Sequence, residues 1–297
     1  MLRPSWIKRR LFWLICLLLV AIAFPARADE RLKIVASFSI TGDLVRNVGG
    51  DRVEVTTLVG PNADVHVYTP APVDAKTIAD AKLVVVNGLG LEGWLPRLVQ
   101  SAGGKAAIIV ASNGITPLKL GSQADPHAWQ SVANAKIYVA NIRDALAAAD
   151  PADAAVFRAN AERFLAELDA LDAEVRAAVA KIPLERRKVI STHNAFGYFA
   201  QAYGIAFIAP VGVSTETEPS ARDIAQIIGQ IKQAKIPAVF LENMSDDRLI
   251  GRIAAESGAT VGGTLFSDAL TGEKGDAPTY IAMVRHNINA LTSALDR

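Results

Sequence analysis

Residues 151–181 read PADAAVFRANAERFLAELDALDAEVRAAVAK and divide the chain into two halves of similar design. Apolar side chains recur along this segment at intervals of mostly three or four residues, which places them on one face of a helix. These positions are Phe157, Ala161, Phe164, Leu168, Leu171 and Val175. Asp150 and Pro151 form a helix-start signal, and Pro183 follows the predicted end. The pattern predicts one long connecting helix over residues 153–182.

Short β-rich apolar runs alternate with helical patterns on both sides of this helix. In the first half they cover residues 32–37, 53–59, 83–87 and 107–111. In the second half they cover residues 188–191, 206–209 and 238–241. Such alternation is typical of the α/β class, in which the strands form mostly parallel sheets.

The two halves resemble each other. Residues 33–37, KIVAS, are similar to residues 188–192, KVIST, and each run is followed by a polar or aromatic loop and a helix. We therefore expect two similar α/β lobes, residues 29–152 and 183–297, with a cleft between them. Open α/β sheets bind ligands just beyond the carboxyl ends of their strands. His193 directly follows such an end.

The first 28 residues have the layout of a signal peptide. Basic residues 8–10 precede an apolar stretch, residues 11–24, that is about 14 residues long, whereas a membrane span needs ~20. Ala28 ends a small-x-small triplet, so we expect cleavage after Ala28 and export to the periplasm. Cys16 lacks the small preceding residues of a lipoprotein signal, so no lipid anchor is expected. The mature chain has no cysteine, which excludes thiolate metal sites.

The overall composition excludes several classes of partner. The chain carries 31 basic and 30 acidic residues and has no basic stripe that would bind nucleic acid. It also contains no GxxxxGK[ST] loop for a nucleotide phosphate. The mature length of about 270 residues is large enough for two lobes with their own cores.

Histidine is scarce, and its placement indicates a metal site. Of four histidines, His66 lies in a turn-rich run, His127 follows a polar loop, and His193 ends an apolar run. Three loops of this kind can meet at one point only if the fold gathers them. Three imidazoles and one carboxylate would complete a four-coordinate shell for Zn²⁺. We expect His286, in a helical pattern near the C-terminus, to be a surface residue.

The fourth ligand has several candidates in the second half. Asp268 follows the apolar residues 264–266, and Glu242 ends the predicted strand that begins at residue 238. Either carboxylate could stand at a strand end. Asp246 and Asp247 are weaker candidates, because they have the character of helix-start residues.

Other residues near these loops have structural interpretations. Asp64 and Asp125 each stand two residues before a histidine, and we expect turn and cap roles for both rather than ligation. Residues 220–223 have the pattern of a capping box that starts a helix. We expect Trp94 and Trp129 to belong to the core.

Five segments carry a resemblance to a known family. They are GPNADVHVY at 60–68, NGLGLEGW at 87–94, DPHAW at 125–129, STHNAFGYF at 191–199 and EPSA at 218–221. Their order resembles that of the zinc- and manganese-binding solute-binding proteins of ABC transporters, called cluster A-I or family 9. The resemblance extends across nearly the whole mature chain.

This resemblance implies both a ligand set and a function. The metal ligands would be His66, His127, His193 and Asp268. Zn²⁺ would be preferred, because manganese-binding members commonly carry a carboxylate where this chain has His193, although Mn²⁺ stays possible. The protein would have no catalytic activity and would deliver Zn²⁺ to the membrane permease of an ABC importer. We expect a monomer, and a periplasmic zinc chaperone is a further candidate partner.

Some features depart from the family pattern or suit another function. Residues 67–126 contain no histidine, whereas many zinc members have a histidine-rich loop there. Val65 replaces a common proline, and Asn194 replaces a frequent aspartate. The main rival function is a metal-dependent hydrolase with an open fourth position. The sequence contains no HExxH motif to support that function.

Overall fold

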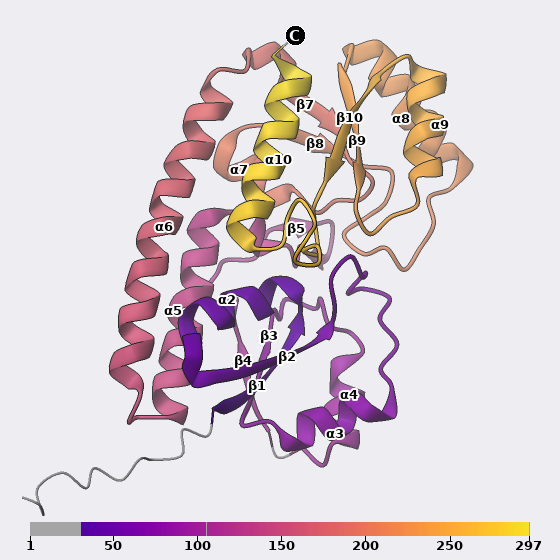
Figure 1. Cartoon of the computed structure of the whole chain (residues 1–297). Helices are drawn as coiled ribbons and strands as arrows, with labels where there is room; N and C mark the ends of the chain where they lie inside the picture. Colours follow the sequence, from indigo (N-terminus) through magenta and orange to yellow (C-terminus); the bar gives the residue numbers. More distant parts are fainter. Residues whose placement is uncertain (1–30, 105, 297) are drawn as a thin grey trace, which may run out of the picture. The chain divides into compact units, whose positions relative to one another are not determined.

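The computed structural model describes residues 31–104 and 106–296. They form two four-stranded sheets in which all paired strands run parallel, with helices packed beside them (Figure 1). The predicted α/β class is confirmed. The predicted signal peptide, residues 1–28, and Cys16 within it lie outside the described residues. None of the described helices is long and apolar enough to cross a membrane.

The first sheet belongs to the first half of the chain. Its strands are β1 (Leu32–Phe38), β2 (Val53–Val59), β3 (Leu83–Val86) and β4 (Ala107–Val110), in the order β2-β1-β3-β4. The helices of this half are α2 (Ser39–Gly49), α3 (Pro72–Asp80), α4 (Leu95–Ser101) and α5 (Val132–Ala149). The 3₁₀ turns η2 (Gly50–Arg52) and η3 (Ala128–Gln130) belong here too. So does a small antiparallel hairpin of β5 (Lys119–Leu120) and β6 (Gln123–Ala124), whose two-residue strands are too short to be predicted.

The second sheet repeats the arrangement of the first. Its strands are β7 (Lys188–Ile190), β8 (Ala206–Ile208), β9 (Ala238–Glu242) and β10 (Thr260–Leu265). They lie in the order β10-β9-β7-β8, which equals the order of the first sheet when the strands are counted within each half. The remaining elements are η4 (Leu184–Arg186), α7 (Gly197–Tyr203), α8 (Ala221–Ala234), α9 (Asp247–Ser257) and α10 (Tyr280–Leu295). The predicted internal repeat is therefore a repeat of topology.

The sequence pattern missed the first part of β10. Gly262 and Gly263 interrupt its apolar pattern, and the pairing with β9 shifts between Val261 and Thr264. A Cβ at Gly262 would lie 2.6 Å from the ring of Phe240. Gly263 has a φ of +118°, which side chains disfavour. The glycines that hide this strand from sequence reasoning are thus the residues that let it bend against β9.

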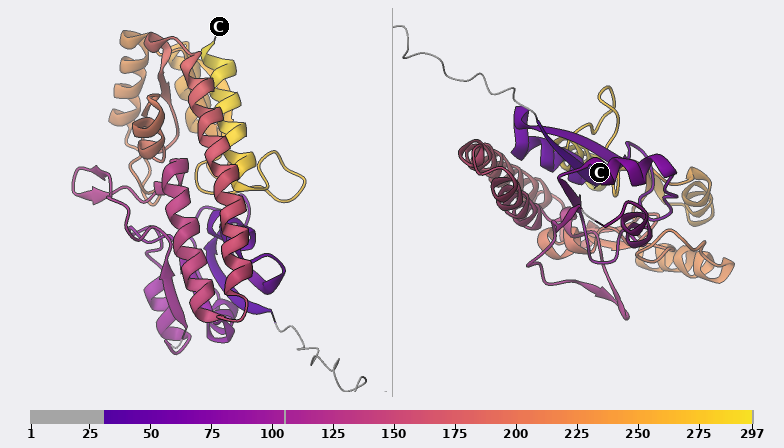
Figure 2. Two further views of the ribbon diagram at one scale, coloured as in Figure 1. Left: turned by 90° about the vertical axis from the view of Figure 1, so that its left-hand side faces the viewer. Right: turned by 90° about the horizontal axis from the view of Figure 1, so that it is seen from below.

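The long helix α6 (Ala154–Ala180) confirms the expected connection between the halves. All six apolar positions of the predicted face are buried. The helix begins three residues after Pro151, because that proline lies in a turn in which Asp150 O accepts a hydrogen bond from Asp153 N. α6 lies beside α5 and also contacts α2, α7 and α10 (Figure 2). The division of the mature chain at residues 152 and 182 stays a prediction.

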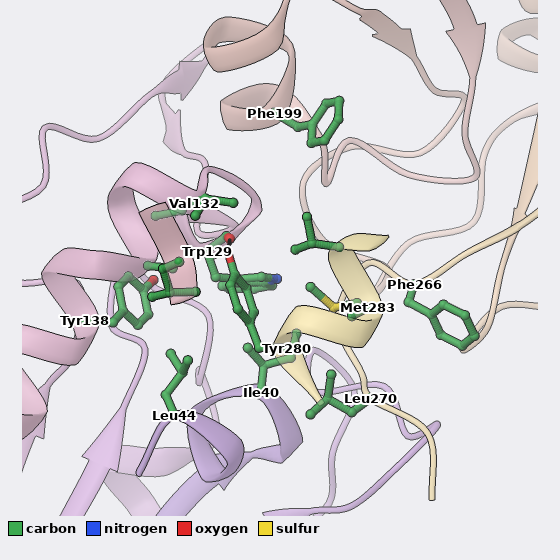
Figure 3. Packing of buried hydrophobic residues seen from close by; sticks show 14 of the residues in the cluster. Ile40, Leu44, Trp129, Val132, Tyr138, Phe199, Phe266, Leu270, Tyr280 and Met283 are labelled. Carbon is green, nitrogen blue, oxygen red and sulfur yellow. Dashed lines mark hydrogen bonds between the residues drawn. The ribbon is translucent and has the colours of Figure 1, made fainter. Parts of the chain in front are cut away.

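The largest hydrophobic cluster spans both halves, and each half has a smaller cluster of its own. Trp129 of the first half packs with Tyr280 and Met283 of the second in a continuous cluster (Figure 3). The indole Nε1–H of Trp129 donates to Ser267 O at 2.9 Å. The hydroxyl of Tyr280 donates to Trp129 O at 2.6 Å. Trp129 is completely buried, as predicted. Buried polar links of this kind fix the relative position of the segments around Trp129 and Ser267.

Candidate metal centre

Four side chains from distant parts of the chain meet at one buried point. His66 lies in the loop between β2 and α3, and His127 directly precedes η3. His193 and Asp268 each follow the carboxyl end of a strand, β7 and β10. One nitrogen or oxygen atom from each of the four side chains lies within 4.8 Å of the others, and all four residues are buried. The fold thus gathers the loops that the sequence pattern singled out.

The distances between the candidate ligand atoms are those of a metal shell. His127 Nε2 lies 3.2 Å from His66 Nε2 and 3.3 Å from His193 Nε2. One oxygen of Asp268, Oδ2, lies 3.2 Å from His66 Nε2 and 3.1 Å from His193 Nε2. The other, Oδ1, lies 3.5 Å from His127 Nε2. Ligands about 2.0–2.1 Å from a tetrahedral Zn²⁺ stand about 3.3–3.4 Å apart, so these spacings suit that geometry.

Carboxylates behind two of the rings turn the Nε2 atoms toward each other. His127 Nδ1 lies 2.7 Å from Asp125 Oδ1, and His193 Nδ1 lies 2.6 Å from Glu242 Oε2. A ring that donates its Nδ1–H to a carboxylate presents an unprotonated Nε2, which is the form that binds a metal. Sequence reasoning left Glu242 as a rival ligand. The structure places it behind His193, with Asp268 among the Nε2 atoms.

Glu242 is held in place by a full set of hydrogen bonds. Its Oε1 accepts the backbone N–H groups of Thr192 at 2.8 Å and His193 at 3.0 Å. Its Oε2 accepts the hydroxyl of Ser267 at 2.7 Å, in addition to the imidazole of His193. Sequence reasoning missed this orienting role. The sequence signal for this role is an acidic residue, Glu242, at the end of β9, with His193 shortly after the end of the neighbouring strand β7.

The electrostatics of the cluster favour a cation. Burial would raise the pKa of Asp268, but the rings of His127 and His193 hold it well below its usual value. Burial would lower the pKa of His193, yet the carboxylates of Glu242 and Asp268 hold it well above its usual value. Burial opposes the charge of His127 too, and Asp268 and Asp125 outweigh it and raise the pKa. Protons and a metal ion therefore compete for the same nitrogens.

Asp268 has no other polar partner. Both of its oxygens are buried without a hydrogen-bond donor, apart from the ring nitrogens that face them. Since Asp125 and Glu242 already accept the Nδ1–H groups behind them, neutral rings of His127 and His193 have no N–H left for Asp268. With neutral rings, Asp268 would be a buried carboxylate without a donor, which is costly. A divalent cation would satisfy the carboxylate and the three ring nitrogens together.

The remaining aspartates of the sequence analysis have turn and cap contacts. Asp64 Oδ1 accepts the backbone N–H of His66 at 2.8 Å, which is the turn role predicted for it. Asp125 Oδ1 does the same for His127 at 3.0 Å. Asp246 caps α9 by accepting the backbone N–H of Arg248 at 2.9 Å. The predicted capping box at residues 220–223 is also present.

His286 is the residue that sequence reasoning placed wrongly. It is half-buried rather than a surface residue. Its ring lies 4.7 Å from that of Phe266, and its Nε2 is 3.0 Å from Thr264 O. The sequence pattern of α10 cannot reveal this contact, because the partner of His286, Thr264 O, belongs to β10 and lies elsewhere in the sequence. It lies outside the four-residue cluster, as expected.

Known proteins resemble this chain along nearly its whole length. The family model described as ZnuA, zinc-uptake complex component A periplasmic, matches residues 34–294. The chain belongs to this family. Among its curated relatives, the iron-binding protein YfeA of Yersinia pestis is 34% identical, over 90% of this chain and 87% of that protein. The manganese-binding lipoprotein MntA of Bacillus subtilis is 35% identical, over 90% of this chain and 91% of the relative.

Solved structures of similar sequence share the fold. The periplasmic zinc binding protein TroA from Treponema pallidum aligns with a TM-score of 0.87 at 31% identity, over 90% of this chain and 100% of TroA. A manganese-bound periplasmic metal binding protein from Candidatus Liberibacter asiaticus aligns with a TM-score of 0.82 at 30% identity, over 89% and 100%. The names of these family members include zinc, manganese and iron. The resemblance to family 9 solute-binding proteins is thus confirmed, while the metal differs among the relatives.

Proposed function

We propose that this protein binds one divalent transition-metal ion outside the cytoplasm and delivers it to the permease of an ABC importer. The metal ligands would be His66, His127, His193 and Asp268. The observation that carries this proposal is the buried cluster of three Nε2 atoms around a carboxylate that has no other polar partner. Family members are substrate-binding transport proteins and not enzymes, so a metal-dependent hydrolase is excluded.

We infer Zn²⁺ as the transported ion. Three nitrogen ligands and one carboxylate suit its preference for a four-coordinate shell, and the spacings of 3.1–3.3 Å around His66, His127 and Asp268 Oδ2 fit its short bonds. The family's zinc-uptake description and the zinc-named TroA support this choice. The name of the iron-binding YfeA points to a third metal for sequences of this kind.

Mn²⁺ is the second candidate, and it has equal support from the relatives. MntA is named for manganese, and the Liberibacter protein is manganese-bound. In this chain both oxygens of Asp268 face ring nitrogens, at 3.1–3.5 Å. A carboxylate that used both oxygens would raise the coordination number above four, which suits Mn²⁺ better than Zn²⁺.

We propose that residues 1–28 are removed as a signal peptide after Ala28, and that the mature protein acts in the periplasm as a monomer. MntA is named a lipoprotein, but Cys16 lacks the small preceding residues of a lipidation signal. The permease is the main partner in this proposal. A periplasmic zinc chaperone is a second, because residues 67–126 contain no histidine that could gather metal.

Titration of the metal-free mature protein with Zn²⁺ and Mn²⁺ tests the proposal. We expect tight one-to-one binding that is lost in both His193→Ala and Asp268→Ala. Glu242→Ala should weaken binding without abolishing it, since Glu242 holds a ring and not the ion. Unchanged affinity in the first two variants would overturn the site. The coordination number of the bound ion, four or higher, decides between Zn²⁺ and Mn²⁺, because affinity alone favours Zn²⁺ over Mn²⁺ at almost any such site.

A further inference from the structure

A cavity of about 200 Å³ reaches the buried cluster from one side. We name it the access cavity and define it by six of its lining residues: Asp64, Thr192, His193, Thr215, Glu218 and Asp246. His193 is the candidate metal ligand in its wall. Asp64 belongs to the same loop as His66. The side chain of His66 is 4% exposed, whereas the side chains of the other three candidate ligands are 0% exposed. His193 is thus the one candidate ligand that lines this cavity, and the loop of His66 borders it through Asp64.

The charges of the access cavity are mostly negative. Asp64, Glu218 and Asp246 contribute three carboxylates from three separate segments of the chain. Arg248 is the counter-charge, because it forms an ion pair with Asp246 and is also attracted by Glu218. The carboxylates outnumber the nearby arginine, so the cavity favours cations. A wall of one sign of charge in a confined space raises the local concentration of the opposite ion.

An unpartnered hydroxyl in the wall supplies a second, independent observation. Thr192 is only 7% exposed, and its Oγ1 is buried without a hydrogen-bond partner. Its backbone N–H is held by Glu242 Oε1 at 2.8 Å. A buried polar atom of this kind normally finds a partner. The nearest space that could supply one is the access cavity, which Thr192 lines next to His193.

We propose that the access cavity is the route by which the metal ion reaches and leaves the cluster, and that a hydrated divalent cation pauses there. Its water would bond to Thr192 Oγ1 while the carboxylates balance its charge, until the Nε2 of His193 replaces a water ligand. Asp64 links the two sides of this route, since its Oδ2 accepts the hydroxyl of Thr215 at 2.6 Å. The inference rests on the proposed function, because it concerns the path to the same metal site.

Association and dissociation rates of Zn²⁺ with the full mature protein test this route. In stopped-flow competition with a fluorescent chelator, Glu218→Gln should slow association by about tenfold at low ionic strength. Arg248→Gln should have the opposite effect and speed association, because it removes the counter-charge. Thr192→Val should slow association and dissociation together and leave the dissociation constant nearly unchanged. Thr192→Ser keeps the hydroxyl and should restore both rates.

A matched pair on the same helix provides the control. Arg252 and Glu256 form an exposed ion pair on α9 and do not line the access cavity. Arg252→Gln and Glu256→Gln change the net charge by the same amounts as Arg248→Gln and Glu218→Gln do. All four are also compared at one ionic strength near 0.15 M, where charges are screened beyond about 8 Å, and there we expect wild-type rates for the control pair only. If these variants change the rates as much as the cavity variants do, overall charge is the cause and the route is overturned.

The outcomes also separate this inference from the proposed function. Wild-type protein that binds neither Zn²⁺ nor Mn²⁺ would contradict the function itself. Tight binding by wild-type protein, with unchanged rates in Glu218→Gln, Arg248→Gln and Thr192→Val, would contradict only the route.

Discussion

At the scale of single residues, a carboxylate holds each of the three histidines of the cluster, either through the ring or through the backbone. Asp125 and Glu242 hold the rings of His127 and His193 through Nδ1. Asp64 instead holds the backbone N–H of His66. Two rings are thus oriented directly, and the third is positioned through its loop. Outer partners of this kind set ring tautomer and basicity, so they influence metal affinity without touching the ion.

Replacing Glu242 with glutamine should weaken metal binding although the shape of the side chain is kept. The carboxylate of Glu242 accepts four hydrogen bonds, two at each oxygen. In glutamine an NH₂ group replaces one of these oxygens, and because that group cannot accept hydrogen bonds, two of the four are lost. We expect the affinity for Zn²⁺ to fall by roughly 10–100-fold, measured by competition titration. Glu256→Gln, on the exposed face of α9, is the matched control and should bind as wild type does. Equal affinities for both variants would show that the bond between Glu242 and His193 is unimportant.

Metal binding should weaken as the pH falls. The pKa values of His127 and His193 are raised, so these rings hold protons to higher pH than ordinary histidines, and the metal must displace them. A raised pKa stabilises the metal-free fold at low pH, and this contribution disappears as the pH rises through the folded-state pKa. The gain in Tm on adding Zn²⁺ should therefore grow between about pH 6 and about pH 8. Calorimetry in two buffers should show proton release on binding. A gain independent of pH would contradict this assignment.

At the scale of elements, strand ends and one long helix determine where the ligands lie. His193 and Asp268 follow β7 and β10 in the same sheet, so parallel strands deliver both to one edge. α6 packs against helices of both halves with a continuous buried stripe. None of the stripe residues is among the four candidate ligands, so stability and metal binding can be perturbed separately.

Shortening one side chain of this stripe should destabilise the fold without affecting the site. Leu168 is completely buried on α6, and Leu168→Ala would leave a cavity. We expect a loss of about 2–5 kcal/mol in the free energy of unfolding, measured by urea denaturation. The dissociation constant for Zn²⁺ should stay unchanged in the folded variant. Leu184, which is 78% exposed, is the matched leucine, and Leu184→Ala should cost less than about 0.5 kcal/mol. Similar losses in both variants would contradict the packing of α6.

At the scale of the whole molecule, the metal centre stands beside the core that the halves share. The hydrogen bonds of Trp129 and Gln130 both reach Ser267 O, one residue before Asp268. The hydroxyl of Tyr280 fastens the backbone of Trp129 from the other side. The segments that carry His127 and Asp268 are therefore tied together by the protein itself. This arrangement favours limited closure when the ion binds.

Limited closure can be measured in solution. We expect the small-angle scattering curves of metal-free and Zn²⁺-loaded protein to superimpose, because the shared core resists hinge motion. Tyr280→Phe should lower stability by about 1–3 kcal/mol, since Trp129 O would lose its buried donor. Tyr68→Phe serves as a comparison, because that hydroxyl donates to Asp74 within the first half and does not join the two halves. A clear decrease in radius of gyration on adding Zn²⁺ to the wild-type protein would contradict limited closure.

Much of the fold could be predicted because its signals are local. The spacing of apolar residues on α6 and the β-rich runs of both halves follow from backbone geometry, so the sequence reveals them directly. The start of β10 is not predictable from local pattern, because Gly262 is explained only by its contact with Phe240 and Gly263 only by its φ of +118°. His286 was misplaced for a similar reason, since its partner Phe266 belongs to another element.

The residue types of the site and their places at loops and strand ends can be read from the amino-acid order. His66, His127 and His193 stand out through scarcity, and Asp268 and Glu242 both stand out as carboxylates at strand ends. That Asp268 faces the rings while Glu242 stands behind His193 follows only from the packing of the strands. Both carboxylates follow apolar strand residues, so local patterns cannot separate them. The difference arises from which side of an imidazole each one reaches, and that depends on how β9 and β10 lie beside β7.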